Sequence, residues 1–220
     1  MNCPICNSHT HKLNIAHSCI KCSEILKCDE CDYQFVDCSN YTSKDIYKHQ
    51  FDNSDKFGHN KPRNISYLKY LQSFKDELKI EKILEIGTPK DHNFLSRIHK
   101  QFGDSIKIYS YDIIDNQLPD YINFSKNKNN LIKENIDILF CIHTLEHIPS
   151  NELLEFVKFC KTVSKNMVFE VPLCETSDRV LESTTNPHYS FFTRKSIRKL
   201  FGNMNTEVNG KVLKFDNIVI

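Results

Sequence analysis

Cysteine pairs near the start of the chain are the side chains best suited to bind a metal ion. Seven of the ten cysteines fall within the first 38 residues, and six of these form three Cys-x-x-Cys pairs. The pairs are Cys3 with Cys6, Cys19 with Cys22, and Cys28 with Cys31. Each pair can make a tight turn that directs two thiolates at one metal, so two pairs suit a tetrahedral zinc ion. The start Met-Asn-Cys-Pro lacks the apolar segment of a signal peptide, so we expect a cytoplasmic protein in which metal binding is favoured over disulfides.

The choice of zinc ligands stays open at this level. The favoured set is the first and last pairs, Cys3, Cys6, Cys28 and Cys31, with a strand at 24–27 leading into the last pair. The middle pair, Cys19 and Cys22, could replace either of them, or bind a second ion with Cys38 and a histidine from His11, His17 or His49. We expect a structural zinc, because a unit this small buries too little apolar surface alone and catalytic zinc sites include histidine or carboxylate.

A second group of chemically capable side chains follows the apolar segment Ile136–Ile142. This segment has the composition of a strand covered on both faces, and it leads directly into His143, Glu146 and His147. Ligands of parallel sheets bind beyond the carboxyl ends of the strands. Histidine titrates near physiological pH, so these residues are candidates for proton transfer at that edge.

Two further strand ends predict an adenosine-bearing cofactor. The apolar segment Ile83–Gly87 ends on a glycine, and the segment 106–111 ends before Asp112. A glycine there lets the backbone approach a ligand closely, and an acid at the next strand end accepts hydrogen bonds from ribose hydroxyls. The segment Thr88-Pro89-Lys90 follows without the second and third glycines of that pattern.

The remaining pattern alternates strands and helices, which predicts an α/β fold with a Rossmann-like, mostly parallel sheet of seven strands and helices on both faces. We expect a small zinc-ribbon-like unit at residues 1–40, a polar linker at 41–63 and the sheet domain at 64–220. Strands are expected at 82–87, 106–112, 121–125, 136–142, 167–171, 206–208 and 215–220. Helices are expected at 45–50, 64–78, 93–101, 150–163 (capped by Ser150) and 194–201, with a loop at 173–187.

Several of these segments follow one another in the order of a known motif series. They are Ile83–Gly87, Asp112, Asp137–Pro149 and Val168–Pro172. Together they resemble the motifs of class I S-adenosylmethionine-dependent methyltransferases over residues 64 to 220. Asn186–Thr193 also resembles the segment before the last helix in a subgroup that includes sugar and other small-molecule methyltransferases. Members of that subgroup often begin with a zinc unit, and Ile25–Asp37 is similar to its second knuckle.

The resemblance implies a cofactor site. Glu85 and Gly87 would lie beside the methionine and ribose parts of S-adenosylmethionine, and Asp112 would bind the ribose diol. Thr88 or Lys90 would stand where further glycines let the chain pass the cofactor. The other implied contacts are Ile113, His143 and, near the adenine, Asn123 or Phe124.

The resemblance also implies roles in methyl transfer, in which the protein positions the acceptor and, where needed, removes its proton. His147 and His143 suit the role of base, and Glu146 could orient one of them or hold a substrate hydroxyl. His188 could enter from the opposite side of the crevice. The alternative for each is a structural role, because in many members of the family the Glu-His pair only bonds backbone at the strand end.

The leading hypothesis is therefore an enzyme that methylates a small molecule, such as a sugar or a nucleotide-linked sugar. One alternative is a protein or nucleic-acid acceptor guided by the zinc unit, although a formal net charge of +1 gives no broad attraction to nucleic acid. Another is a catalytically silent scaffold. No apolar run is long enough to cross a bilayer, so no membrane partner is expected.

Overall fold

The computed structural model divides the chain into two compact units. It describes residues 1–17, 24–37, 68, 71–72, 79–89, 92–201, 207–209 and 212–214. The first unit comprises Met1–Asp52, His143–Lys158 and Phe169–Ile220, and the second comprises Asn53–Ile142 and Phe159–Val168. Outside the described residues lie Cys19, Cys22, Cys38, Lys90, the linker with its short helix, most of the helix expected at 64–78, and the strand expected at 215–220.

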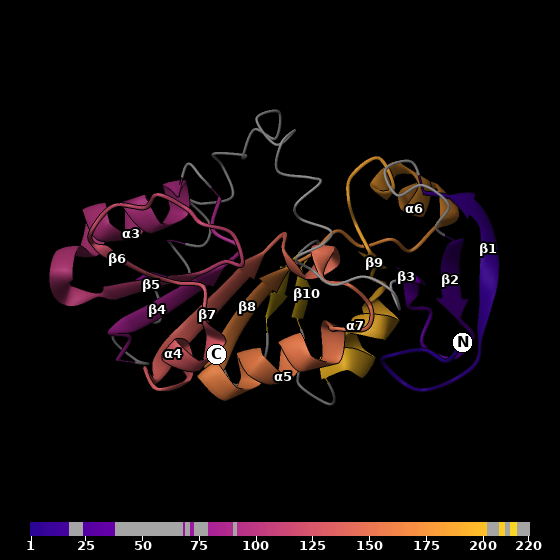
Figure 1. The fold of residues 1–220 in the computed structure, drawn as a ribbon, viewed down its shortest axis with the longest axis horizontal. Helices are drawn as coiled ribbons and strands as arrows, with labels where there is room; N and C mark the ends of the chain where they lie inside the picture. Colours follow the sequence, from indigo (N-terminus) through magenta and orange to yellow (C-terminus); the bar gives the residue numbers. More distant parts are fainter. Residues whose placement is uncertain are drawn as a thin grey trace. The chain divides into compact units, whose positions relative to one another are not determined.

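The larger sheet confirms the predicted Rossmann-like α/β fold. Its order is β10 (Glu207–Asn209), β11 (Val212–Lys214), β8 (Ser164–Glu170), β7 (Ile136–Ile142), β4 (Lys82–Ile86), β5 (Lys107–Tyr111) and β6 (Ile122–Ser125). Strand β4 is parallel to both β5 and β7, and β5 is parallel to β6 (Figure 1). The chain runs from β4 outward to β6 and returns on the other side of β4, so the strand order reverses there. Such a reversal is where ligands bind in open α/β sheets.

The central strands of the second unit are apolar because both of their faces are covered. Ile83 and Leu84 in β4 are fully buried. The exception in β7 is Asp137, whose carboxylate accepts hydrogen bonds from the backbone N–H groups of Glu81 and Lys82 at 2.8 and 2.7 Å. This side chain takes the place of backbone–backbone hydrogen bonds at the start of β4, and it helps to fix the register of β4 against β7.

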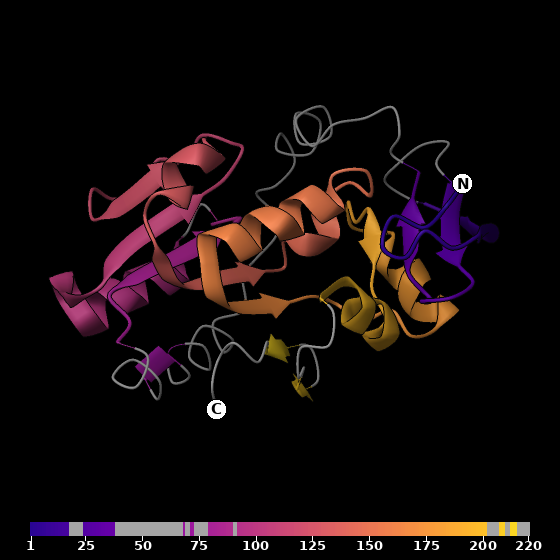
Figure 2. The same cartoon turned by 90° about the horizontal axis from the view of Figure 1, so that it is seen from below.

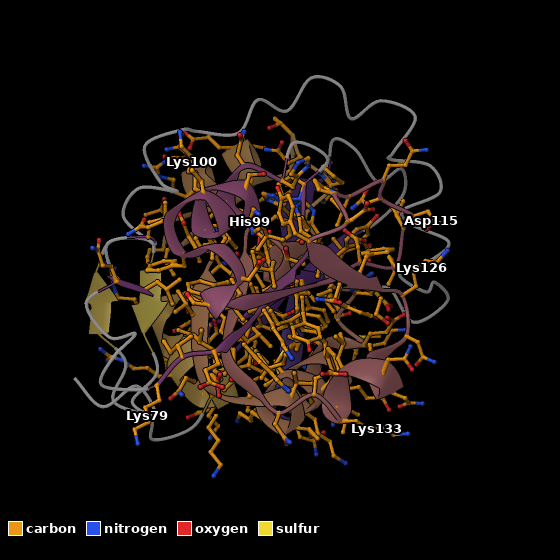
Figure 3. The ribbon with its side chains drawn as sticks, turned by 90° about the vertical axis from the view of Figure 1, so that its left-hand side faces the viewer. Lys79, His99, Lys100, Asp115, Lys126 and Lys133 are labelled. Carbon is orange, nitrogen blue, oxygen red and sulfur yellow. The ribbon has the colours of Figure 1, made fainter. Side chains whose placement is uncertain are left out.

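Three helices of the described residues correspond to helices expected from the apolar spacing. They are α3 (Asn93–Phe102), α5 (Leu153–Val163) and α7 (Arg194–Phe201). Two short helices, α4 (Lys128–Ile132) and α6 (Ser177–Ser183), were not expected. Helix α3 buries Phe94, Leu95 and Ile98. Its His99, labelled in Figure 3, stacks on Tyr121 with ring centroids 3.9 Å apart, which ties α3 to the residue before β6.

The first unit contains a four-stranded antiparallel sheet. Its order is β1 (Thr10–Ala16), β2 (Glu24–Cys28), β3 (Gln34–Val36) and β9 (Ser190–Phe191). Figure 2 shows the N-terminal strands in indigo beside the orange segment that supplies β9. The sheet shares one apolar cluster formed by Ile25, Val36, Cys174, Val180, Tyr189 and Phe191. Residues before 40 and after 170 therefore fold together, and the domain boundary expected near residue 40 stays a prediction.

Two local predictions are wrong. Helix α5 begins at Leu153, and Ser150 is not its cap, because the Ser150 hydroxyl donates to the Val36 carbonyl at 3.0 Å. The loop expected at 173–187 contains α6, which begins after Thr176, whose side chain accepts a hydrogen bond from the backbone N–H of Arg179. Among the described residues, no helix has the length and apolar character needed to cross a membrane.

Candidate functional site

The four cysteines favoured from the sequence lie together in the first unit. The Sγ atoms of Cys3 and Cys31 are 3.6 Å apart, those of Cys6 and Cys28 are 3.4 Å apart, and all four lie within 4.8 Å of one another. Four sulfurs bound to one zinc at about 2.3 Å would be about 3.8 Å apart. The donor set therefore fits a closed four-thiolate zinc site with no position left open for water.

The backbone turns that present these thiols are alike in the two pairs. Asn7 directly follows the first pair with φ 62°, and Asp32 directly follows the second with φ 58°. Asparagine and aspartate tolerate this left-handed conformation better than most other side chains. In the second turn the N–H of Cys31 donates to the Sγ of Cys28 at 3.4 Å. Each turn thus directs two sulfurs at a common centre. In the second turn a backbone amide also points at one of these sulfurs.

The thiols of this cluster are electrostatically coupled. The hydrogen bond between Cys3 and Cys31 lowers the pKa of Cys3 and raises the pKa of Cys31, as expected for two sulfurs that share one proton. The other described cysteines, Cys141, Cys160 and Cys174, are buried core residues, and burial raises the pKa of Cys174 to about 11.

Strand β3, which follows the second cysteine pair, holds the segment at 188–192. The Tyr33 hydroxyl lies 2.5 Å from the hydroxyl of Ser190, and the backbone N–H of Val36 donates to the Tyr189 carbonyl at 2.9 Å. The Tyr33 ring also packs against Phe192. The cysteine cluster is thereby connected, through bonded neighbours, to the segment that carries His188.

In the second unit, the loop after Gly87 is closed by side-chain hydrogen bonds. Gly87 has φ 75°, which glycine adopts without strain, and its N–H donates to the Tyr111 carbonyl at 2.9 Å. The next residue, Thr88, is buried and accepts a hydrogen bond from the Ser110 hydroxyl at 2.7 Å. Its carbonyl accepts one from the Asn116 amide at 3.0 Å. These contacts hold the loop where the usual motif has further glycines.

Replacing Thr88 with valine should destabilise the protein by about 1–3 kcal/mol, because it leaves the buried Ser110 hydroxyl without its acceptor. Urea unfolding followed by circular dichroism measures the loss. Thr88→Ser is the matched control, since it removes a methyl group and keeps the hydroxyl. Equal losses in the two variants would contradict the role of this hydrogen bond.

Asp112 stands at the end of β5, next to the end of β4. Because parallel strands end at one edge of a sheet, Gly87 and Asp112 lie on the same edge of the second unit. Burial raises the pKa of Asp112 to about 6, although its Oδ1 accepts a hydrogen bond from the Ile114 N–H at 3.1 Å. A half-buried carboxylate with unused acceptor capacity is what a ribose diol requires.

The other predicted cofactor residues of this unit lie in or directly after its strands. Glu85 is buried within β4, and Ile113 is half-buried after Asp112. Asn123 in β6 donates its amide to the Ile108 carbonyl at 3.0 Å. Their contacts with a cofactor stay predictions.

In the first unit, His143 is held between two buried glutamates. It follows β7 with φ 50°, which non-glycine residues rarely adopt. Its Nδ1 is 3.1 Å from Oε1 of Glu146, and its Nε2 is 3.2 Å from Oε1 of Glu170. The two carboxyl groups fix the orientation of the ring. The role of His143 as a base stays a prediction.

Glu146 lies between His143 and a pair of further histidines. Burial opposes its ionisation, but the hydrogen bond from His143 and the nearby histidine charges hold its pKa below the ordinary value. One ligand atom each from Glu146, His147 and His188 lie within 4.8 Å of one another. The two imidazole rings meet edge to face with centroids 4.8 Å apart, and burial lowers the pKa of His188 to about 4.

The sequence missed two residues of this cluster. Glu170 ends the apolar strand β8, and an acid at a strand end is the same signal that selected Asp112. Ser183 lies in α6, and its hydroxyl is 2.5 Å from Nδ1 of His188. Nothing in the local sequence marks Ser183, because the contact depends on how α6 packs.

Comparisons with known proteins agree on the fold. No family model matches the chain, and no curated protein matches it in sequence. Among solved structures, a SAM-dependent methyltransferase from Archaeoglobus fulgidus matches with TM-score 0.54 and 17% identity, over 74% of this chain and 75% of that one. A variant of LepI in complex with SAH and a substrate analogue matches with TM-score 0.51 and 13% identity, over 81% of this chain and 53% of that one. The chain thus has the class I fold found in S-adenosylmethionine-dependent methyltransferases.

Proposed function

We propose that the protein transfers a methyl group from S-adenosylmethionine to a small-molecule acceptor. The observation that carries the proposal is the pair of Gly87 and Asp112 at adjacent strand ends, where the strand order reverses around β4. Gly87 would let the backbone pass the cofactor, and the Asp112 carboxylate would accept hydrogen bonds from the ribose hydroxyls. The shared fold supports this assignment.

For the acceptor, the proposal assigns proton removal to His147. Its Nδ1 is 3.0 Å from the Pro187 carbonyl, so Nδ1 donates and Nε2 carries the lone pair. Glu146 would stabilise the imidazolium that forms, and His143 would hold Glu146 in place. We further propose that Cys3, Cys6, Cys28 and Cys31 bind one structural zinc ion.

Calorimetric titration with S-adenosylmethionine tests the proposal, and we expect saturable binding with one cofactor per chain. Gly87→Ala should weaken binding about tenfold or more, because a Cβ at this position would narrow the approach of the cofactor to the backbone. Gly103→Ala is a matched control, since Gly103 also has positive φ (55°) but a Cβ there meets nothing within 4 Å. Absence of binding to the wild-type protein would favour the silent scaffold.

The acceptor class is tested on the same protein. Transfer of a labelled methyl group to a panel of sugars and nucleotide-linked sugars would support a small-molecule acceptor. Labelling of protein or RNA in preference to that panel would favour the macromolecular alternative.

A further inference from the structure

We propose that Glu146, His147 and His188 form a second metal site, for one divalent transition-metal ion, with zinc as the ion that we expect. Their ligand atoms all lie within 4.8 Å of one another. Two imidazoles and one carboxylate make up a common three-residue donor set for zinc and other first-row metals, which leaves further coordination positions open. This donor set differs from the four thiolates of Cys3, Cys6, Cys28 and Cys31.

The first argument is the orientation of the two histidines. Nδ1 of His147 lies 3.0 Å from the Pro187 carbonyl, and Nδ1 of His188 lies 2.5 Å from the Ser183 hydroxyl. A carbonyl only accepts, so the hydrogen of His147 resides on Nδ1, and the Ser183 hydroxyl can accept from His188 in the same way. Both Nε2 atoms then carry lone pairs. A ligating histidine typically donates its second nitrogen to a carbonyl or another polar group in this manner.

The second argument is the carboxylate. Glu146 is completely buried, and its Oε1 lies 3.1 Å from Nδ1 of His143. Its Oε2 is also buried, and no described group hydrogen-bonds to it. A buried carboxylate oxygen without a donor has lost the hydrogen bonds that water would give it, and a cation beside it compensates for that loss. The unpaired oxygen belongs to the residue that completes the donor set.

The third argument is that the backbone already holds the ligands together. The N–H of Tyr189 donates to the Glu146 carbonyl at 2.8 Å, which joins the two segments that carry the ligands. The His188 carbonyl accepts from Nε2 of His17 at 2.8 Å, and the His188 N–H donates to the Asn186 carbonyl at 2.7 Å. The ligands are thus positioned before an ion binds, which limits the ordering cost of binding.

This site has a consequence for the proposed methyl transfer, and that consequence alone rests on the proposed function. Coordination uses the Nε2 lone pair that would otherwise accept the acceptor's proton. With an ion held there, an acceptor hydroxyl bound to it would be more acidic and would release its proton to solvent water. The oxygen would then take the methyl group as the bond from that carbon to the sulfonium sulfur breaks, and S-adenosylhomocysteine would leave. Metal binding itself can be tested without any activity.

The test is the zinc content of the full-length protein after loading with zinc and gel filtration, measured by mass spectrometry. We expect two zinc ions per chain in the wild type, one on the cysteines and one here. His147→Ala and His188→Ala should each retain one. His99→Ala, which removes a histidine of α3 outside both clusters, should retain two.

A third variant separates metal binding from folding. Ser183→Ala changes no ligand, and loss of the group that orients His188 should weaken the second ion about 10- to 100-fold. Competition with a zinc-binding dye measures that affinity, and thermal unfolding shows whether each variant is folded. One zinc ion per chain in the wild type, with the same content in both histidine variants, would overturn the proposal. So would two ions in both histidine variants, or an unchanged affinity in Ser183→Ala.

Discussion

Cys28→Ser is expected to remove the zinc ion proposed for the four cysteines and most of the stability of the first unit. Cys28 is fully buried, with its Sγ 3.4 Å from that of Cys6, and a serine oxygen is a poor replacement for a thiolate on zinc. Zinc binding in small units contributes folding free energy directly, about 10–16 kcal/mol in isolated zinc-finger peptides. The loss is therefore comparable with the whole stability of a typical domain, about 5–15 kcal/mol. Zinc content and thermal unfolding of the purified variant measure it.

The matched control for this variant is Cys160→Ala. Cys160 is also fully buried, but it lies in α5 among apolar residues, and its loss leaves only a small cavity. We expect it to keep its zinc and to lose about 1–2 kcal/mol. If Cys28→Ser keeps the zinc content and the melting temperature of the wild type, the four cysteines do not form a structural zinc site.

The loss in Cys28→Ser should extend to the histidine cluster. Strand β3 begins six residues after Cys28, and it pairs with β9, directly after His188 and Tyr189. The Tyr33 hydroxyl and the Val36 amide hold that segment from the zinc side. The cysteine unit therefore supports the segment that carries His188, although none of its cysteines is a ligand of the metal site proposed at the histidine cluster.

The sequence predicts the sheet well because its strands are marked locally. The segments of β4, β5 and β7 are mostly apolar, and each leads to a residue selected as a site candidate: Gly87, Asp112 and His143. Likewise, the spacing within Cys3-Pro-Ile-Cys6 and Cys28-Asp-Glu-Cys31 encodes the thiol cluster in short turns. In these cases the chemistry and the element that positions it are adjacent in the chain.

The parts that the sequence could not predict depend on contacts between distant segments. Ser150 has the residue type of a helix cap, but its hydroxyl bonds the Val36 carbonyl, more than a hundred positions away. Ser183 orients His188 only because α6 folds against it. His143 was selected by residue type, whereas its two partners, Glu146 and Glu170, are identified only in the folded chain. Residue type suggests chemistry, but the partners of each nitrogen depend on how the chain folds.

Asp112 should make folding stability depend on pH in an unusual direction. Burial raises its pKa from an ordinary value near 3.8 to about 6. Between about pH 4 and 6 the folded protein therefore holds a proton that the unfolded chain has released. The contribution of Asp112 to the free energy of unfolding thus falls as pH rises. Above pH 6 the buried, ionised carboxylate lowers the free energy of unfolding by about 3 kcal/mol. Asp112→Asn should thus be more stable than wild type at pH 7.5 by up to about that amount, and the difference should disappear toward pH 4.

Urea unfolding of both proteins at the two pH values measures this difference, and groups common to both proteins cancel. A variant that is less stable than wild type at pH 7.5 would contradict the cost assigned to burial of the carboxylate.

Cofactor binding should show the opposite dependence, because the ribose hydroxyls donate to the ionised carboxylate. Below pH 6 the wild-type affinity for S-adenosylmethionine should fall by about tenfold per pH unit. Asp112→Asn at pH 7.5 should bind about 10- to 100-fold more weakly than wild type, since hydrogen bonds to a charged group contribute about 1.5–3 kcal/mol. Its affinity should change little between pH 5 and 7.5, which makes it the control for titration of the cofactor itself. Equal affinities in the two proteins would remove Asp112 from the cofactor site. A more stable variant that binds more weakly would show that the buried carboxylate lowers stability in return for cofactor binding.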